Sequence, residues 1–546
     1  MRQGTSIAPF QSIPPEIFAH ITSFIPLHLG PKILLSLVLG NRRFYDIFYP
    51  ILYSRLVLRN EDDAIMVFQR ILSEEHLGLS VTQIHLMSEL SLETRHCAKP
   101  FDVLVGLEAM VKNRRLPRLA TLNIHLLKGW HYDKHWRLIW GHGRLTVDFW
   151  RTLRTECPRL RGLTLRNVGH GPTDTWLSGS VIDEINCFTD LSSLRLEFPG
   201  SMTGPPAEEV LRIINNLPRL ASTLHTLSIG GELTNGISFF LLDFPNLKWL
   251  RLHHFTSGHE AHNSMQFFER HPQLESLTLS DCHNAWFVTD FKGSFLPKLK
   301  HLKVGELISI FSSFGDQFVL QAGFEDIRRL VHILPQLISL AFVNSYNAQV
   351  PYLLRSVLPH GLPSLKSLEI QQSSVGWDSR KLEGVLWYET LDGKFQLATT
   401  KKRMPRNLTN EYVYSIVRGA PNLEEFGLQG MYFRSEHLRA LAPPLTELSK
   451  LERLYFYSFS PHPRVSNMIP EEDHLMLISD FLSGAESLGR ACARLDSVTS
   501  ISGTHLPYLS GIVQRNPDGG VIGIKQCEGF GMQLSTHEDD PFPCYP

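Results

Sequence analysis

One short phrase of residues recurs along most of this 546-residue chain. It consists of a proline, a leucine two positions later, a second leucine three positions on, and then an aliphatic residue after one more. Pro117, Leu119, Leu122 and Ile124 form one copy. The prolines of the other copies are Pro158, Pro245, Pro272, Pro297, Pro335, Pro363 and Pro421, and looser copies begin at Val81, Leu191, Leu224 and Leu451. Because such repetition is typical of stacked repeat units, we expect a solenoid rather than one compact core.

A segment with helical spacing of apolar residues precedes several of these prolines. Val147, Trp150, Leu153 and Cys157, for example, come before Pro158. Proline has no amide proton and clashes with the preceding turn, so it ends a helix at a fixed offset from the leucines that follow. Each repeat is therefore predicted to be a helix, a corner and a strand.

The leucines of each phrase alternate with other residues, as in a half-buried strand. In one copy this alternation points Leu163 and Leu165 inward and Thr164 and Arg166 outward. A single repeat cannot cover its own apolar face, whereas neighbouring repeats that stack can bury a continuous row of leucines. We expect a parallel inner sheet with outer helices.

The phrase resembles leucine-rich repeats of the irregular type. Cys282, three residues after Leu279, stands where that family often has Asn or Cys. The resemblance covers residues of about 80 to 515 and implies an α/β leucine-rich-repeat solenoid shaped as a curved horseshoe.

A separate apolar block precedes the repeats. Its first segment is bounded by Pro14 and Pro26, residues that can open and end a helix. An apolar run from Ile33 to Leu39 follows, and then a third segment rich in aromatic residues. About fifty residues in three short helices cannot bury this many apolar side chains among themselves. We expect part of this surface to contact a partner.

This block resembles the F-box. Pro14, Glu16, Ile17, Ile21 and Pro26 match the first part of that pattern, and Arg42, Arg43 and Phe44 match its last part, whereas Ile13 replaces the usual opening Leu. The resemblance implies a surface for the small SKP adaptor made of Pro14, Ile17, Ile21, Leu34, Leu35 and Val38. The alternative is that these residues only cap the open edge of the solenoid.

An F-box followed by leucine-rich repeats implies a substrate-recognition subunit of an SCF-type cullin–RING ubiquitin ligase. Its partners would be the SKP adaptor, through it a cullin, and an unknown protein substrate. An interaction scaffold with a degenerate F-box, unconnected to ubiquitination, is the alternative. The expected organisation is an N-terminal tail (1–11), the F-box (12–58), the repeat array (59–515) with an insertion at about 371–410, and a C-terminal strand and flexible tail (516–546).

The outward strand positions are the candidate substrate-binding residues. The predicted set is Arg166, Arg195, Arg251, His253, Lys303, Tyr455 and Tyr457. Its four Arg and Lys residues suit an acidic or phosphorylated segment, because guanidinium groups match carboxylate and phosphate oxygens. The alternative is a solvated face whose charges pair with neighbours such as Glu197.

Composition excludes several other classes of function. With 53 basic and 54 acidic residues, the net charge of −1 gives no global attraction to nucleic acid or anionic lipid. No run approaches the roughly 20 apolar residues that span a bilayer. The seven cysteines include no Cys-x-x-Cys pair, which favours a reducing compartment, cytoplasmic and/or nuclear. We expect no catalytic residue, metal or cofactor, since histidine pairs such as His131 and His135 lack the further ligands that a zinc site needs.

Overall fold

The structure of the chain is a computed structural model, and it divides into two compact units. The units are Met1–Glu232 and Leu233–Pro546. The residues that the structure describes are 14–23, 30–58, 61–88, 100–126, 145–166, 179–197, 213–233, 237–255, 261–280, 296–305, 333–345, 361–372, 386–389, 395–398, 413–414, 416–430, 435–458, 471–502 and 509–528.

Unit 1 begins with a block of three helices, hereafter the helical block. They are α1 Pro15–Ser23, α2 Gly30–Val38 and α3 Arg42–Ser54. The three helical segments predicted from the sequence are confirmed. Asn41 caps α3, because its side-chain oxygen accepts a hydrogen bond of 2.8 Å from the Phe44 amide.

Three phenylalanines form the centre of the helical block. The ring of Phe18 on α1 meets the rings of Phe44 and Phe48 on α3 edge to face, with centroids 6.1 and 5.4 Å apart. Phe44 and Phe48 lie four residues apart on one face of α3, and their own centroids are 5.5 Å apart. Such pairs stabilise by about 0.5–1.5 kcal/mol each beyond the area they bury.

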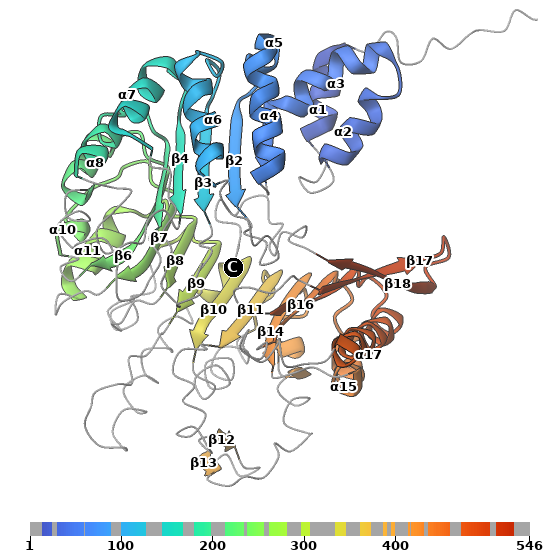
Figure 1. Ribbon diagram of the computed structural model, residues 1–546. Coiled ribbons are helices and arrows are strands. Elements are labelled where there is room, and N and C mark those ends of the chain that lie inside the picture. The colour runs from blue at the N-terminus through green and yellow to red at the C-terminus, as the bar shows by residue number, and fades with distance from the viewer. Residues whose placement is uncertain are drawn as a thin grey trace, which may run out of the picture. The chain divides into compact units, whose positions relative to one another are not determined.

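The remainder of unit 1 is a series of strands and helices. The strands are β1 Arg55–Leu58, β2 Gln83–Ser88, β3 Thr121–Leu126, β4 Gly162–Arg166, β5 Ser193–Glu197 and β6 Thr226–Leu233. The helices are α4 Glu61–Ser73, α5 Glu75–Gly78, α6 Pro100–Lys112, α7 Val147–Glu156, α8 Gly179–Ile185 and the 3-10 helix η1 Leu217–Arg219. The six strands lie in sequence order in one parallel sheet, and α4, α6, α7 and α8 line one of its faces (Figure 1).

Leucines form continuous rows between this sheet and its helices. Leu163 pairs in register with Leu122 on one side and Leu194 on the other, and all three side chains are fully or almost fully buried. Each leucine of this kind contributes about 1.5–3 kcal/mol through burial. Leu163 and Leu165 are buried as predicted, and Thr164, which was predicted to face outward, is also largely buried, at 8% exposed.

The corner before each strand is tied to the preceding repeat. The amides of Arg161 and Gly162 both donate to the carbonyl of Ala120, at 2.8 and 3.0 Å. The Leu160 amide donates to the Cys157 carbonyl at 3.0 Å, across the proline that has no amide to satisfy. The same arrangement recurs at later corners, so the proline phrase fixes where each strand begins.

Unit 2 continues the pattern. Its main strands are β7 Trp249–Phe255, β8 Ser276–Ser280, β9 His301–Gly305, β10 Ser339–Ser345, β11 Ser367–Gln372, β14 Glu425–Gly430, β15 Arg453–Ser458, β16 Ser497–Ser502, β17 Leu509–Arg515 and β18 Val521–Glu528. Its helices are α10 Ile237–Phe240, α11 Ala261–Arg270, η3 Leu334–Gln336, α15 Ser435–Leu445 and α17 Glu471–Ala491. The strands from β7 to β16 are parallel, and β17 and β18 then pair antiparallel.

Every predicted strand phrase forms a strand, and the structure adds elements that the sequence did not indicate. The sheet of unit 1 already begins at Arg55 with β1, inside the range predicted for the F-box. In unit 2 the predicted C-terminal strand is β18, and it pairs antiparallel with β17, which the sequence did not indicate. Strands β12 Leu386–Glu389 and β13 Phe395–Ala398 pair as a hairpin within the predicted insertion. Cys282 lies outside the described residues, and so does the predicted flexible tail, because the described residues end at 528.

Candidate functional site

The helical block exposes several of the apolar side chains predicted to bind a partner. Ile17 is 47% exposed, Ile21 51% and Leu35 49%. Pro14 is exposed and Leu34 is half-buried. Val38 is only 6% exposed, so most of its side chain packs within the chain.

The sequence of α1 explains why these isoleucines face outward. Phe18 fills the core of the block, and Ile17 and Ile21, four residues apart, share a different stripe of the helix. Burying an aliphatic side chain of this size is worth about 1.5–3 kcal/mol, which the block does not gain from Ile17 or Ile21. A cluster of exposed aliphatic residues of this kind is typical of a protein interaction site.

Aromatic residues connect the helical block to the first helix of the repeats. Tyr45, Tyr49 and Tyr53 follow one another along α3, with ring centroids 4.5 and 5.0 Å apart. Arg70 of α4 places its guanidinium 5.9 Å from the centre of the Tyr49 ring, within the range of a cation–π contact. The helical block therefore has a defined contact with α4, the first helix of the repeat array.

The outward-facing residues of β1 to β6 form what we call the inner face of unit 1. Arg195, predicted to bind substrate, is half-buried there and lies in register with Thr164. Arg166 pairs in register with Glu197, one row further along the strands, but both side chains lie outside the described part of the structure. The structure therefore places Arg195 and Arg166 in different rows.

Two polar residues of this face were not among the predicted site residues. Arg55 stands on β1, a strand that lacks the proline phrase, and His85 stands on β2, in the loosest copy of that phrase. The signal that could have found them is the pair of buried aliphatics beside each, Leu56 and Leu58 in the first strand.

His85 is held in its neutral form. Burial, followed by the positive charges of Arg55 and Arg195, lowers the pKa of His85 to about 3. Its Nδ1 accepts a hydrogen bond of 2.8 Å from the side-chain nitrogen of Asn123 on β3. Three strands besides β2 thus contribute to the surroundings of this imidazole.

In unit 2 the corresponding face carries paired charges. Lys303 on β9 lies 3.6 Å from a carboxylate oxygen of Glu369 on β11. Arg453 on β15 forms an ion pair with Glu425 on β14, whose side chain is almost fully buried. Glu425 thus neutralises a cation of the adjacent strand, and Glu369 neutralises a cation two strands away.

The remaining predicted substrate-binding residues all lie in unit 2. Arg251 is half-buried and shares a row with Thr278 and Lys303. Tyr455 is 5% exposed, which leaves little of its ring accessible to a ligand. The side chains of His253 and Tyr457 lie outside the described residues.

The described residues offer neither a metal-binding cluster nor a reactive buried cysteine. Within the described ranges, no three His, Cys, Asp or Glu residues are grouped so that they could hold a metal ion. Burial raises the pKa of the Cys157 thiol to about 12 and that of Cys492 to about 11, so both are protonated and unreactive at neutral pH. His131 and His135 lie outside the described residues.

Comparison with known proteins gives likenesses to solved structures only. No protein-family model matches the sequence, and the search of curated proteins finds no match. Among solved structures, the chain is similar to the leucine-rich repeat-containing protein LegL7 from Legionella pneumophila. The two are 12% identical, the match covers 83% of this chain and 91% of that one, and the TM-score is 0.25, too low to establish a shared fold. Among the described helices, none has the length and apolar character needed to cross a membrane.

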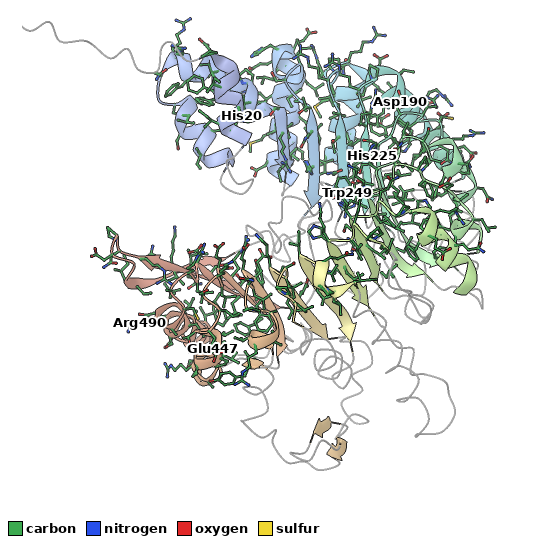
Figure 2. All side chains as sticks on the ribbon, turned by 180° about the vertical axis from the view of Figure 1, so that it is seen from behind. His20, Asp190, His225, Trp249, Glu447 and Arg490 are labelled. Carbon is green, nitrogen blue, oxygen red and sulfur yellow. The ribbon has the colours of Figure 1, made fainter. Side chains whose placement is uncertain are left out.

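Figure 2 shows the described side chains, with His20 marking helix α1 of the helical block and Asp190 marking the corner before β5. At that corner Asp190 lies 3.7 Å from the guanidinium of Arg161, which precedes β4. Both side chains are about half exposed or more, so this pair contributes little to stability. Exposed corner pairs of this kind are weaker candidates for binding than the charged residues of the inner face.

Proposed function

We propose that this chain is a non-catalytic substrate-recognition adaptor of an SCF-type cullin–RING ubiquitin ligase. The helical block docks the SKP adaptor and through it a cullin, and the repeat array binds the protein to be ubiquitinated. The observation that carries this proposal is the exposure of Ile17, Ile21 and Leu35 on a block that has its own aromatic core. The resemblance of the same residues to the F-box gives the partner its identity.

Two further features support the proposal. Arg70 and Tyr49 connect the block to the array, and a fixed connection suits a protein that must hold its target at a set distance from a catalytic partner. The parallel sheets offer long rows of outward side chains, which differ from strand to strand and so can be specific for one target.

The test is co-purification of the full-length chain with the SKP adaptor and a cullin. We expect the wild type to retain both partners and Ile17→Asp to lose both, because a charge in a buried apolar interface has no compensating partner. Ile522→Asp is the matched control, since Ile522 is 68% exposed on β18, outside the helical block. Circular dichroism of each variant verifies that it is folded.

Retention of neither partner by the wild-type chain would contradict the ligase proposal. Retention of the SKP adaptor without a cullin would instead favour the interaction scaffold. Equal retention by wild type and Ile17→Asp would remove the helical block surface from the proposal.

A further inference from the structure

The turns that precede three strands of unit 1 share the tripeptide Pro-Arg-Leu. It occurs at residues 117–119 before β3, 158–160 before β4 and 218–220 before β6. In the turns of unit 2 the residue between the corresponding proline and leucine is Asn246, Gln273, Lys298, Gln336, Ser364 or Asn422. The fold therefore does not require arginine at this position, although unit 1 has it three times.

The three arginines, Arg118, Arg159 and Arg219, are hereafter the turn arginines. In each turn the amide of the leucine donates a hydrogen bond to the carbonyl of the residue before the proline, at 3.1 Å for Leu119, 3.0 Å for Leu160 and 2.9 Å for Leu220. Proline and arginine are thus the two central residues of a four-residue turn. Both end residues of each turn are buried and the arginine is exposed, so the arginine lies at the tip of the turn.

The carboxylates near these turns serve other arginines. Arg114 lies 3.0 Å from Glu156, and Arg161 lies 3.7 Å from Asp190, which is labelled in Figure 2. No carboxylate of the described residues forms an ion pair with a turn arginine. The turn arginines therefore give this part of unit 1 an excess of accessible positive charge.

The order of the strands places the turn arginines in one series. Strands β3 and β4 are neighbours, and β5 alone separates β4 from β6. Neighbouring strands lie about 4.8 Å apart, so the turns before β3 and β4 are close together at the end of the sheet where the strands begin. Each guanidinium can bind a carboxylate through two parallel hydrogen bonds. Such a series matches carboxylates that are distributed along a polypeptide.

We infer that the turn arginines form a docking surface for an acidic protein segment, whose Asp or Glu carboxylates pair with the guanidinium groups. This surface goes beyond the proposed function. It uses neither the exposed isoleucines of the helical block nor the inner face of unit 1.

An acidic protein segment fits these turns better than a nucleic acid or an anionic membrane. Asp190 precedes β5, between the turns before β4 and β6, and its side chain is 63% exposed. A carboxylate at this place repels a continuous run of phosphates, whereas a polypeptide can carry a neutral or basic residue opposite it. Three arginines also neutralise too few phosphates for strong binding of nucleic acid, and the chain has a net charge of −1.

The experiment uses the full-length chain and two fluorescein-labelled dodecapeptides in a polarisation assay at low ionic strength. One peptide alternates glutamate with serine, and the other alternates glutamine with serine. We expect the glutamate peptide to bind and the glutamine peptide to bind at least about ten-fold more weakly. A DNA duplex and vesicles that contain phosphatidylserine serve as unlabelled competitors, and both should displace the glutamate peptide less effectively than the same peptide without its label.

Substitutions then locate the binding surface. Arg118→Gln, Arg159→Gln and Arg219→Gln should each weaken binding of the glutamate peptide by about two- to five-fold, as expected for exposed ion pairs, and the triple variant by at least about ten-fold. Lys298→Gln is the matched control, because Lys298 is exposed at the same turn position in unit 2. It should leave binding unchanged.

Three results would overturn the inference. They are equal affinity for the two peptides, wild-type affinity of the folded triple variant, and displacement of the peptide by DNA or vesicles more readily than by the unlabelled peptide. Circular dichroism verifies that the triple variant is folded.

The two proposals can fail separately. Ile17→Asp should abolish retention of the SKP adaptor and leave peptide binding intact, whereas the triple variant should do the reverse. A chain that retains the adaptor but does not distinguish the two peptides refutes the docking surface alone.

Discussion

The inner faces of the two units share one backbone design and differ in how they use charge. In both, successive parallel strands place outward residues in register over a buried row of leucines. In unit 2 the cation Arg453 is paired with a carboxylate of the adjacent strand, and Lys303 is paired with a carboxylate two strands away. In unit 1 the row of Arg195 also contains His85, Asn123 and Thr164, and the neutral imidazole of His85 accepts a hydrogen bond from the Asn123 side chain. The repeat therefore fixes the positions of the outward residues, and the identity of these residues decides whether ion pairs or neutral hydrogen bonds connect the strands.

The feature that both units share, a buried row of leucines, is tested by replacing one leucine in each unit. Leu163 in unit 1 and Leu277 in unit 2 are both fully buried at equivalent strand positions. We expect Leu163→Ala and Leu277→Ala each to lower the free energy of unfolding by about 2–5 kcal/mol, through lost burial and the cavity left behind. Urea unfolding followed by circular dichroism measures this. A loss below about 1 kcal/mol in only one unit would show that the two cores are not equivalent.

The difference between the charged residues of the two inner faces is tested by neutralising one charged residue on each face. Glu425→Gln leaves Arg453 without its partner in a largely buried place, so we expect unit 2 to lose about 2–3 kcal/mol. Arg195→Gln in unit 1 should cost less, because the side chain of Arg195 is half-buried whereas that of Glu425 is almost fully buried. The same urea titration compares the two variants, and equal losses would erase the contrast.

Acid should destabilise both units through a buried histidine. Burial lowers the pKa of His271 in unit 2, where the Phe244 amide donates to its Nε2 at 2.9 Å, and burial and two arginines lower that of His85 to about 3. Below a pH of about 6.5 the unfolded chain takes up protons that the folded chain does not. Each histidine therefore lowers the free energy of unfolding by up to about 1.4 kcal/mol per pH unit as the pH falls. For His85 this loss continues until a pH of about 3.

Thermal unfolding between pH 7 and 5 measures this dependence. His85→Gln and His271→Gln should each flatten it, since glutamine does not titrate in this range. A pH dependence that both variants leave unchanged would mean that other groups cause it.

The smallest effect is expected at the wider ion pair of unit 2. Lys303 and Glu369 lie 3.6 Å apart with part of each side chain in solvent. Lys303→Gln should therefore cost about 1 kcal/mol, and added salt should reduce the difference from wild type. A loss as large as that of Glu425→Gln would show that the pair is as important as the buried one.

The regular part of the fold could be predicted from the sequence because its signals are local. A proline that ends a helix and leucines that alternate along a strand act within about ten residues, and strands such as β4 and β7 follow the phrase. Strand β1 was missed because Leu56 and Leu58 carry no such proline, and Arg55 was missed with it. His85 lies on β2, which the looser copy at Val81 predicts, but it was not among the predicted site residues. The hairpin of β17 and β18 depends on antiparallel pairing that the phrase does not encode.

The sequence also did not predict how deeply individual outward residues are buried. Tyr455 points away from the leucine rows by register, yet it is 5% exposed, and Val38 of the predicted adaptor surface is 6% exposed. Whether such a side chain is accessible depends on residues of neighbouring strands and helices, which alternation along one strand does not specify. The tautomer of His85 likewise depends on Asn123, which lies 38 residues away in the sequence.

Calorimetric titration of the purified SKP adaptor into the full-length chain tests the central claim most directly. We predict saturable one-to-one binding by the wild type and by Ile522→Asp, and at least about a hundred-fold loss of affinity for Ile17→Asp, as expected when an apolar contact at the centre of an interface is replaced by a charge. Absence of binding by the folded wild-type chain, or binding that Ile17→Asp does not weaken, would contradict the account.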